Sequence, residues 1–253
     1  MWFSSVYLKT LRDARIAILG WGLGLGLLML AVLSAVASLM ATPAARATLV
    51  TLAASFAWIA EPVRVDTPGG YATWKYGFTI LVMALWPILA GSRTLRGEEE
   101  RGSMDALLSL PRARARVALE KIAAMGTALL AMGLLIGLLT YGGGVAAKAD
   151  FGLGGALLFG VNLALICGVF GSIALFISQF TQERRTAAGI TGGLMALFVI
   201  VDMVHRIVPN TDWISRLSPV YYYNLSKPLI PSYGTDPVAM LVMLALSVLL
   251  SGA

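Results

Sequence analysis

The sequence contains very few of the residues that build catalytic and metal sites. Its 253 residues include one cysteine, Cys167, and one histidine, His205. A single cysteine cannot form an internal disulfide, and a zinc site normally needs a cluster of cysteines and histidines. No segment matches the G-x-x-x-x-G-K-[ST] loop that binds the phosphates of ATP. We therefore expect no metal ligand, no catalytic residue and no bound cofactor in this chain, which predicts that it is not an enzyme.

Charge is also scarce. Charged residues make up 13% of the chain, hydrophobic residues make up 58%, and the mean hydropathy is +0.81. Soluble domains are roughly a quarter charged, so this composition predicts an integral membrane protein. Long unbroken apolar runs favour helices over the alternating strands of a membrane barrel. We expect an all-α membrane protein whose partner is the lipid bilayer. We expect no nucleic acid as a partner.

Six apolar runs predict membrane-spanning helices, which need about 20 apolar residues each. They lie at residues 16–40, 76–95, 117–141, 153–180, 186–208 and 237–253. The first run exceeds the length of the apolar core of a cleaved signal peptide, so we expect it to be permanent. The last run stops after 17 residues at Ala253, so we expect the native chain to continue. Together the runs predict a single transmembrane domain over residues 1–253.

The distribution of basic residues predicts the topology. Twelve of the 19 Lys and Arg residues lie in the N-terminal segment, residues 91–121 and residues 181–186. The positive-inside rule places these segments in the cytoplasm, which predicts a multi-pass inner-membrane protein with a cytoplasmic N-terminus. Residues 1–15 carry apolar residues on one helical face, which favours an interfacial helix lying in the membrane surface. A simple Lys/Arg anchor explains the same residues nearly as well.

Two extracellular segments are expected to be structured. Residues 41–73 include an apolar stretch that predicts a short surface helix. Residues 209–236 contain four prolines and five aromatic residues. Proline forbids one continuous helix, and amphipathic aromatic rings favour the headgroup level. This segment therefore predicts a broken, partly re-entrant extracellular cap between spans five and six.

Charge is concentrated in one stretch, GEEERGSMDALLSLPRARARVALEK at residues 97–121, which holds ten of the 32 charged residues. Ser103 is a suitable N-cap for a short amphipathic helix that Pro111 ends. Anionic lipid headgroups attract each nearby basic residue by about 1 kcal/mol, which predicts Arg112, Arg114 and Arg116 as membrane-surface anchors. The same surface repels the three preceding glutamates. From the residues alone, those glutamates fit either a docking surface for another protein or a solvated loop.

This stretch resembles the coupling segment of ABC type-2 exporter permeases, and TPGGY before the second run and Ser218-Pro219 among aromatic residues are similar to that family too. The resemblance implies that a coupling segment, 97–116, seats on a separate ATP-binding cassette subunit, which binds ATP and magnesium. It also implies a substrate path formed by two copies, as a homodimer or with a paralogue. The coupling residues that it implies are Glu98, Glu99, Glu100, Arg101, Gly102, Met104, Asp105, Leu107 and Leu108.

Other features leave alternatives open. Three ionisable residues lie at i, i+3 and i+4 near the end of the fifth run: Asp202, His205 and Arg206. They fit either a functional site or an interfacial Asp202–Arg206 pair. The pairs Gly20/Gly24 and Gly22/Gly26 indicate close helix packing, within the subunit or between subunits. An ion-gradient-driven transporter should carry charges near the middle of its spans, and these runs hold almost none. A membrane assembly protein without transport is the rival that the residues exclude least, and they do not identify a substrate.

Overall fold

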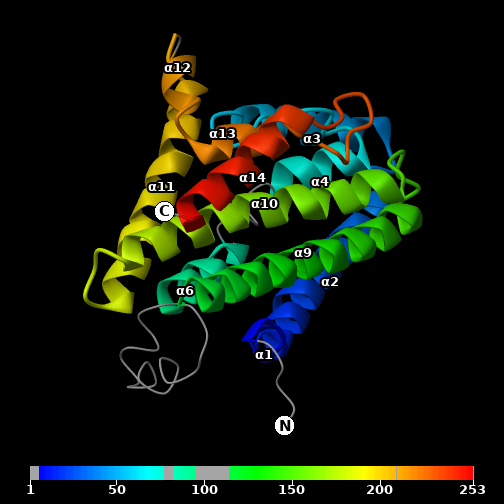
Figure 1. Ribbon diagram of the computed structural model, residues 1–253. Coiled ribbons are helices and arrows are strands. Elements are labelled where there is room, and N and C mark those ends of the chain that lie inside the picture. The colour runs from blue at the N-terminus through cyan, green and yellow to red at the C-terminus, as the bar shows by residue number, and fades with distance from the viewer. Residues whose placement is uncertain (1–5, 77–81, 95–113, 209, 253) are drawn as a thin grey trace.

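The computed structural model describes residues 6–76, 82–94, 114–208 and 210–252, and within these ranges the fold is all-helical (Figure 1). One isolated bridge, between Lys227 and Gly234, is the only extended pairing in the described part. Helix α10 (Leu153–Ser178) lies at the centre and packs against α9 (Arg114–Ala146), α6 (Leu85–Arg93), α14 (Pro237–Gly252) and α11 (Arg184–His205). The all-α prediction is therefore confirmed for the described residues.

Four described helices are long and apolar enough to cross a membrane: α2 (Arg15–Leu39), α9, α10 and α11. They correspond to the first, third, fourth and fifth apolar runs. Helix α14 is apolar but has 16 residues. The second run is described only in part, because residues 77–81 and 95 lie outside the described ranges. Six spans therefore remain a prediction, while a multi-pass membrane protein is established.

Glycine allows the central helices to approach until their backbones touch. A Cβ added at Gly160 on α10 would collide with the carbonyl oxygen of Gly133 on α9, and one added at Gly91 on α6 would collide with that of Gly171 on α10. Only a residue without a side chain permits such contacts. On α2, Gly22 and Gly26 pack against leucine side chains of α9, whereas no described atom lies within 4 Å of a Cβ built on Gly20 or Gly24.

Short helices lie at both ends of the bundle. Helix α1 (Val6–Asp13) precedes α2, and none of its residues is buried. At the other end lie α3 (Pro43–Ser55), α4 (Pro68–Tyr76), α12 (Asp212–Ser215) and α13 (Pro219–Asn224). Ser218 caps α13 by accepting from the amide of Val220, with Pro219 in the first helical position. Prolines thus separate short helices in this segment, as their chemistry requires.

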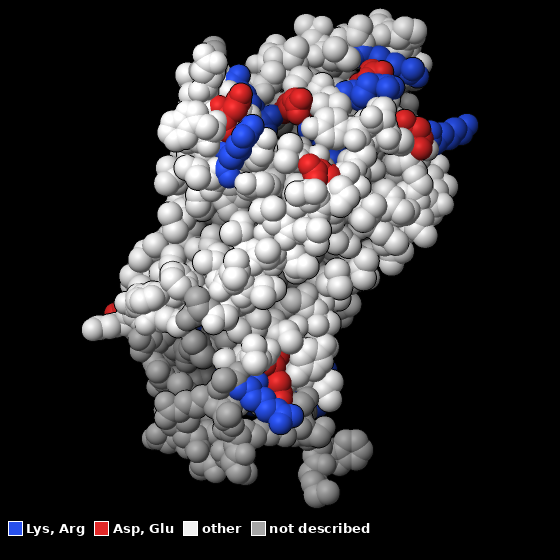
Figure 2. Space-filling model, turned by 45° about the horizontal axis from the view of Figure 1, so that its top comes forward, with Lys and Arg blue, Asp and Glu red and all other residues white. Residues whose placement is uncertain are grey.

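Charged side chains are gathered toward two ends of the molecule. Figure 2 shows blue and red groups at the top and bottom of this face, with a broad band of uncharged residues between them. A band of this kind is what a hydrocarbon layer requires, because an isolated charge in lipid is costly.

Candidate functional site

The residues implied for coupling lie outside the described part of the chain. This applies to Glu98, Glu99, Glu100, Arg101, Gly102, Met104, Asp105, Leu107 and Leu108, and the predicted lipid anchor Arg112 lies outside it too. Arg114 is the first residue of α9. The Nε of Arg116 lies 3.3 Å from Oε1 of Glu120, with 69% of the arginine side chain exposed. The anchoring of these arginines to lipid therefore stays a prediction.

The residues that flank 95–113 are tied together by Lys121. Its Nζ donates a hydrogen bond to the carbonyl oxygen of Thr94, at 3.1 Å. Thr94 is the C-cap of α6. The last carbonyls of a helix lack partners within the helix and carry a partial negative charge, so a cation is favourable there. The lysine on α9 thus holds the end of α6 beside the start of α9.

Glu120 joins the same region to helix α1. Its Oε2 accepts a hydrogen bond from the backbone amide of Tyr7 at 3.2 Å, and the Tyr7 hydroxyl lies 3.1 Å from Oγ1 of Thr127. Amides in the first turn of a helix have no acceptor of their own, and a carboxylate there is stabilising. A side chain of α9 therefore caps α1. We call Tyr7, Thr94, Glu120 and Lys121 the segment base.

A basic cavity of about 280 Å³ lies beside the segment base, between α1, α6, α9 and the start of α11. Arg93, Lys121 and Arg184 line it, together with Asp13 and Trp86. Its excess of positive charge suits the headgroup region of an anionic membrane surface.

A second polar region lies near the other end of α11, where Asp202 is only 4% exposed. Its Oδ2 accepts hydrogen bonds from Nη2 of Arg206 at 2.7 Å and from Nδ2 of Asn224 at 2.9 Å. The predicted Asp202–Arg206 ion pair is thus confirmed, while its position at a membrane interface stays a prediction. His205 is different, because its Nδ1 lies 2.6 Å from the carbonyl oxygen of Asp202 on its own helix. Such a contact gives the imidazole no catalytic partner.

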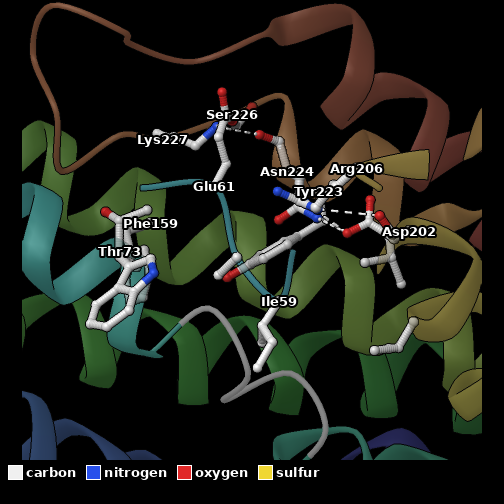
Figure 3. A pocket seen from close by; sticks show the side chains of 14 residues that line it. Ile59, Glu61, Thr73, Phe159, Asp202, Arg206, Tyr223, Asn224, Ser226 and Lys227 are labelled. Atoms are coloured by element: carbon white, nitrogen blue, oxygen red, sulfur yellow. Dashed lines mark hydrogen bonds and ion pairs between the residues drawn. The ribbon is translucent and has the colours of Figure 1, made fainter. Parts of the chain in front are cut away.

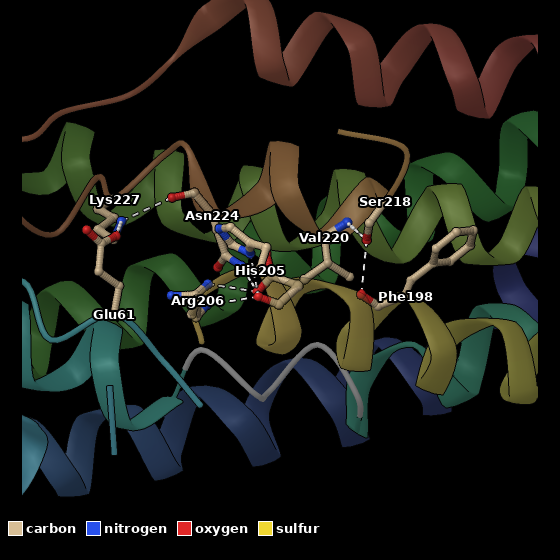
Figure 4. Close-up of polar contacts among 9 residues, drawn as sticks. Glu61, Phe198, His205, Arg206, Ser218, Val220, Asn224 and Lys227 are labelled. Atoms are coloured by element: carbon tan, nitrogen blue, oxygen red, sulfur yellow. Dashed lines mark hydrogen bonds and ion pairs between the residues drawn. The ribbon is translucent and has the colours of Figure 1, made fainter. Parts of the chain in front are cut away.

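Lys227 forms a second ion pair in the same region (Figure 4). Its Nζ lies 2.7 Å from Oε2 of Glu61 and 3.2 Å from the carbonyl oxygen of Asn224. The ammonium also lies 4.0 Å from the centre of the Tyr233 ring, which is within range of a cation–π contact. The lysine side chain is 6% exposed and the Glu61 side chain 53%.

These two ion pairs line one small cavity of about 50 Å³ (Figure 3). We call Glu61, Asp202, Arg206, Asn224 and Lys227 the polar cluster. Two polar atoms of the cavity wall have no hydrogen-bond partner among the described residues: the acceptor Oδ1 of Asp202 and the donor Nε1 of Trp74. The cavity therefore offers an acceptor and a donor that no described residue satisfies.

A buried hydrogen bond attaches Tyr223, which lines the cavity, to helix α10. Nδ2 of Asn162 on α10 donates to the carbonyl oxygen of Tyr223 at 3.1 Å, and both residues are buried. Burial also raises the pKa of the Tyr223 phenol above its ordinary value. The polar cluster is thus joined to the central helix of the bundle.

The sequence is similar to known membrane transport proteins. The family model of the ABC-2 family transporter protein matches residues 4–252. The chain belongs to the ABC-2 transporter family. A similar protein of Stutzerimonas stutzeri, the probable ABC transporter permease protein NosY, is 27% identical over 212 residues, which cover 69% of this chain and 70% of that protein. The resemblance drawn from the charged stretch is confirmed at the level of the family.

Only part of the polar cluster of this ABC-2 transporter is detectable in its sequence. Asp202 and Arg206 were detectable because ionisable residues are rare inside apolar runs. Glu61 and Lys227 lie in polar loops, where single charges are ordinary, and they are separated by 166 positions. Glu120 and Lys121 belong to the charged stretch, but no sequence pattern indicates their partners on α1 and α6.

Proposed function

We propose that this chain is the membrane-spanning permease subunit of an ATP-driven ABC exporter, coupled to separate ATP-binding subunits through residues 97–116. The observation that carries the proposal is the segment base. Lys121 and Glu120 connect the start of α9, directly after that segment, to α6 and α1. A displacement of the segment therefore acts on three helices together. Membership of a transporter family supports the same function.

The mechanism that we propose is alternating access. ATP-driven closure of the partner subunits moves the coupling helix at 104–110, and the segment base passes that movement to the bundle. Helix α9 packs along both α2 and α10, so its displacement acts on both of these helices. ATP and magnesium act in the partner chain, and this subunit contributes the path.

The proposed topology has six spans, including 76–95 and 237–253, with the N-terminus in the cytoplasm of the inner membrane. It puts the segment base at the cytoplasmic face, with α1 as the interfacial helix, and the polar cluster in the extracellular cap. The spacing along α11 supports this placement. Arg184 and Asp202 are 18 residues apart on one helix, or about 27 Å at 1.5 Å per residue, close to the roughly 30 Å of the hydrocarbon core.

We propose that a second copy of this chain, or a paralogue, completes the path by packing against α2 and α11. Both helices leave small residues uncovered by the described chain. No described atom lies within 4 Å of a Cβ built at Gly20, Gly24, Gly189, Gly192 or Gly193. Small residues let two membrane helices approach closely.

The proposal is tested by replacing Glu98, Glu99 and Glu100 together with lysine. The variant is expected to insert normally, because these residues precede the third span, but to lose the ATP-binding subunit on purification and to lose transport. Asp150→Lys is the control, since it reverses an exposed charge near the other end of α9. A triple variant that keeps both partner and transport, or a complex that transports on an ion gradient without ATP, would refute the coupling assignment.

A further inference from the structure

The polar cluster has the properties of a binding site that the protein fills with its own side chain. Lys227 is almost fully buried, so its ammonium needs an anion close by. That anion is Glu61, whose side chain is half exposed and belongs to the loop between α3 and α4. The ion pair thus joins a buried cation to a carboxylate with direct access to solvent.

The unsatisfied atoms of the cavity define the ligand chemistry. Nε1 of Trp74 is a donor and suits an anionic oxygen, whereas Oδ1 of Asp202 is an acceptor and suits a hydroxyl group. Buried polar atoms of this kind are costly unless a partner satisfies them. A ligand that satisfies both atoms therefore carries an anionic oxygen and a hydrogen-bond donor.

Charge balance narrows this chemistry further. The four charged residues that line the cavity, Glu61, Asp202, Arg206 and Lys227, carry no net charge together. If Glu61 leaves, the wall has one uncompensated positive charge, and a single phosphate negative charge restores neutrality. A zwitterionic headgroup would leave the positive charge in place. A phosphate diester with a hydroxyl donor fits both the charge and the hydrogen bonds.

We propose that Lys227 is the anion-binding residue of a site for a hydroxyl-bearing phosphate group, and that Glu61 occupies this site in the absence of ligand. The phosphate replaces the Glu61 carboxylate at Lys227 and accepts from Trp74, while the ligand hydroxyl donates to Asp202. The cavity of about 50 Å³ has room for only a few water molecules, so the ligand enters when Glu61 swings out.

The source of the phosphate that we favour is the headgroup of an anionic glycerophospholipid. The polar cluster lies about 27 Å along α11 from Arg184, which places it at the headgroup level opposite the basic cavity. An apolar band separates the two charged ends (Figure 2), so acyl chains would lie against the uncharged surface. This inference does not depend on ATP coupling.

The test is a binding titration of the full-length protein in phosphatidylcholine nanodiscs, without nucleotide. Dihexanoyl phosphatidylglycerol is the probe, and dihexanoyl phosphatidylcholine is the comparison ligand. Glu61→Gln removes the competing charge and is expected to bind the probe about tenfold more tightly, while Lys227→Gln binds it at least about tenfold more weakly. Asp66→Asn and Arg216→Gln, exposed charges of neighbouring loops, are the matched controls and are expected to bind like the native chain.

Each outcome bears on one part of the inference. A gain of affinity in Glu61→Gln cannot arise from misfolding, so it supports the exchange even if Lys227→Gln is unstable. Unchanged affinity in Glu61→Gln overturns the exchange, and equal affinity for phosphatidylcholine overturns the ligand chemistry. Displacement of the probe by glycerol 1-phosphate or inorganic phosphate at equal concentration would keep the phosphate site but overturn a lipid as its source. Failure of ATP-driven transport in the native chain would leave all of these measurements intact.

Discussion

The ammonium of Lys121 donates a hydrogen bond to the carbonyl oxygen of Thr94, 27 positions earlier in the chain. The contact closes the base of the intervening segment and ties the C-terminal end of α6 to the first turns of α9. A cation near the last carbonyls of a helix is favourable both as a donor and through the helix dipole.

Replacing Lys121 by methionine is therefore expected to weaken coupling. The side chain keeps its length and apolar stem but loses a charged hydrogen bond worth about 1–3 kcal/mol. We expect normal insertion and unchanged binding of the ATP-binding subunit. We also expect fewer substrate molecules to be transported for each ATP that is hydrolysed. The measurement is the ratio of transport to ATP hydrolysis in proteoliposomes. Lys9→Met, an exposed lysine on α1, should keep the native ratio, and a native ratio in Lys121→Met would remove the segment base from the mechanism.

Replacing Glu120 by alanine is expected to release α1 from α9. The amide of Tyr7 loses its acceptor, which costs about 1 kcal/mol by comparison with other helix caps. Hydrogen exchange of residues 6–13 should become several-fold faster, since a loss of 1.4 kcal/mol corresponds to about tenfold. Glu120→Gln retains an acceptor oxygen and should keep most of the protection. If residues 6–13 of Glu120→Ala exchange as slowly as those of the native chain, α1 is held by other contacts.

Breaking the Asp202–Arg206 pair on one side is expected to destabilise the protein strongly. Asp202→Asn leaves the Arg206 side chain, which is 12% exposed, without its carboxylate, and such losses cost about 3 kcal/mol or more in buried pairs. The double variant Asp202→Leu, Arg206→Met should recover much of the apparent Tm in detergent. Equal losses in the single and double variants would indicate that packing, not charge, decides stability at this position.

The backbone contact between Gly133 and Gly160 gives a steric prediction. Gly160→Ala places a methyl group against the carbonyl oxygen of Gly133, and overpacking of this kind costs about 1–3 kcal/mol. Gly168→Ala on the same helix is the control, because the nearest atom to its added Cβ is the Ser247 hydroxyl at 3.5 Å. Thermal unfolding should separate the two variants clearly, and equal Tm values would contradict the close approach of α9 and α10.

The sequence predicts elements well where one signal dominates. The helices α2, α10 and α11 lie within a few residues of their apolar runs, because length and hydropathy determine a membrane helix. Helix α9 extends past the predicted end at residue 141, since Gly143 packs against Leu30 and Leu33 and the glycines remain helical in that contact. Here tertiary packing outweighs the low helix propensity of glycine.

Pairing across long separations could not be predicted in the same way. Nothing in the neighbourhood of Glu61 or Lys227 indicates a partner, and the buried environment of Lys227 arises only when the α3–α4 loop and the segment after α13 meet. The hydrogen bonds of the segment base are similar, because they satisfy helix ends whose positions depend on the folded bundle. The coupling residues themselves lie outside the described residues, so their role stays a prediction.

The glycine contacts described above also determine which parts of the bundle move together. Helices α6, α9 and α10 touch through their backbones at Gly91–Gly171 and Gly133–Gly160, and contacts between backbones leave no side chains to change rotamer. These three helices are therefore expected to move together, and both helices that flank residues 95–113 belong to this group. Helix α11 buries only Ala187, Thr191, Met195 and Asp202 against the described chain, so few buried side chains attach it to this group of helices.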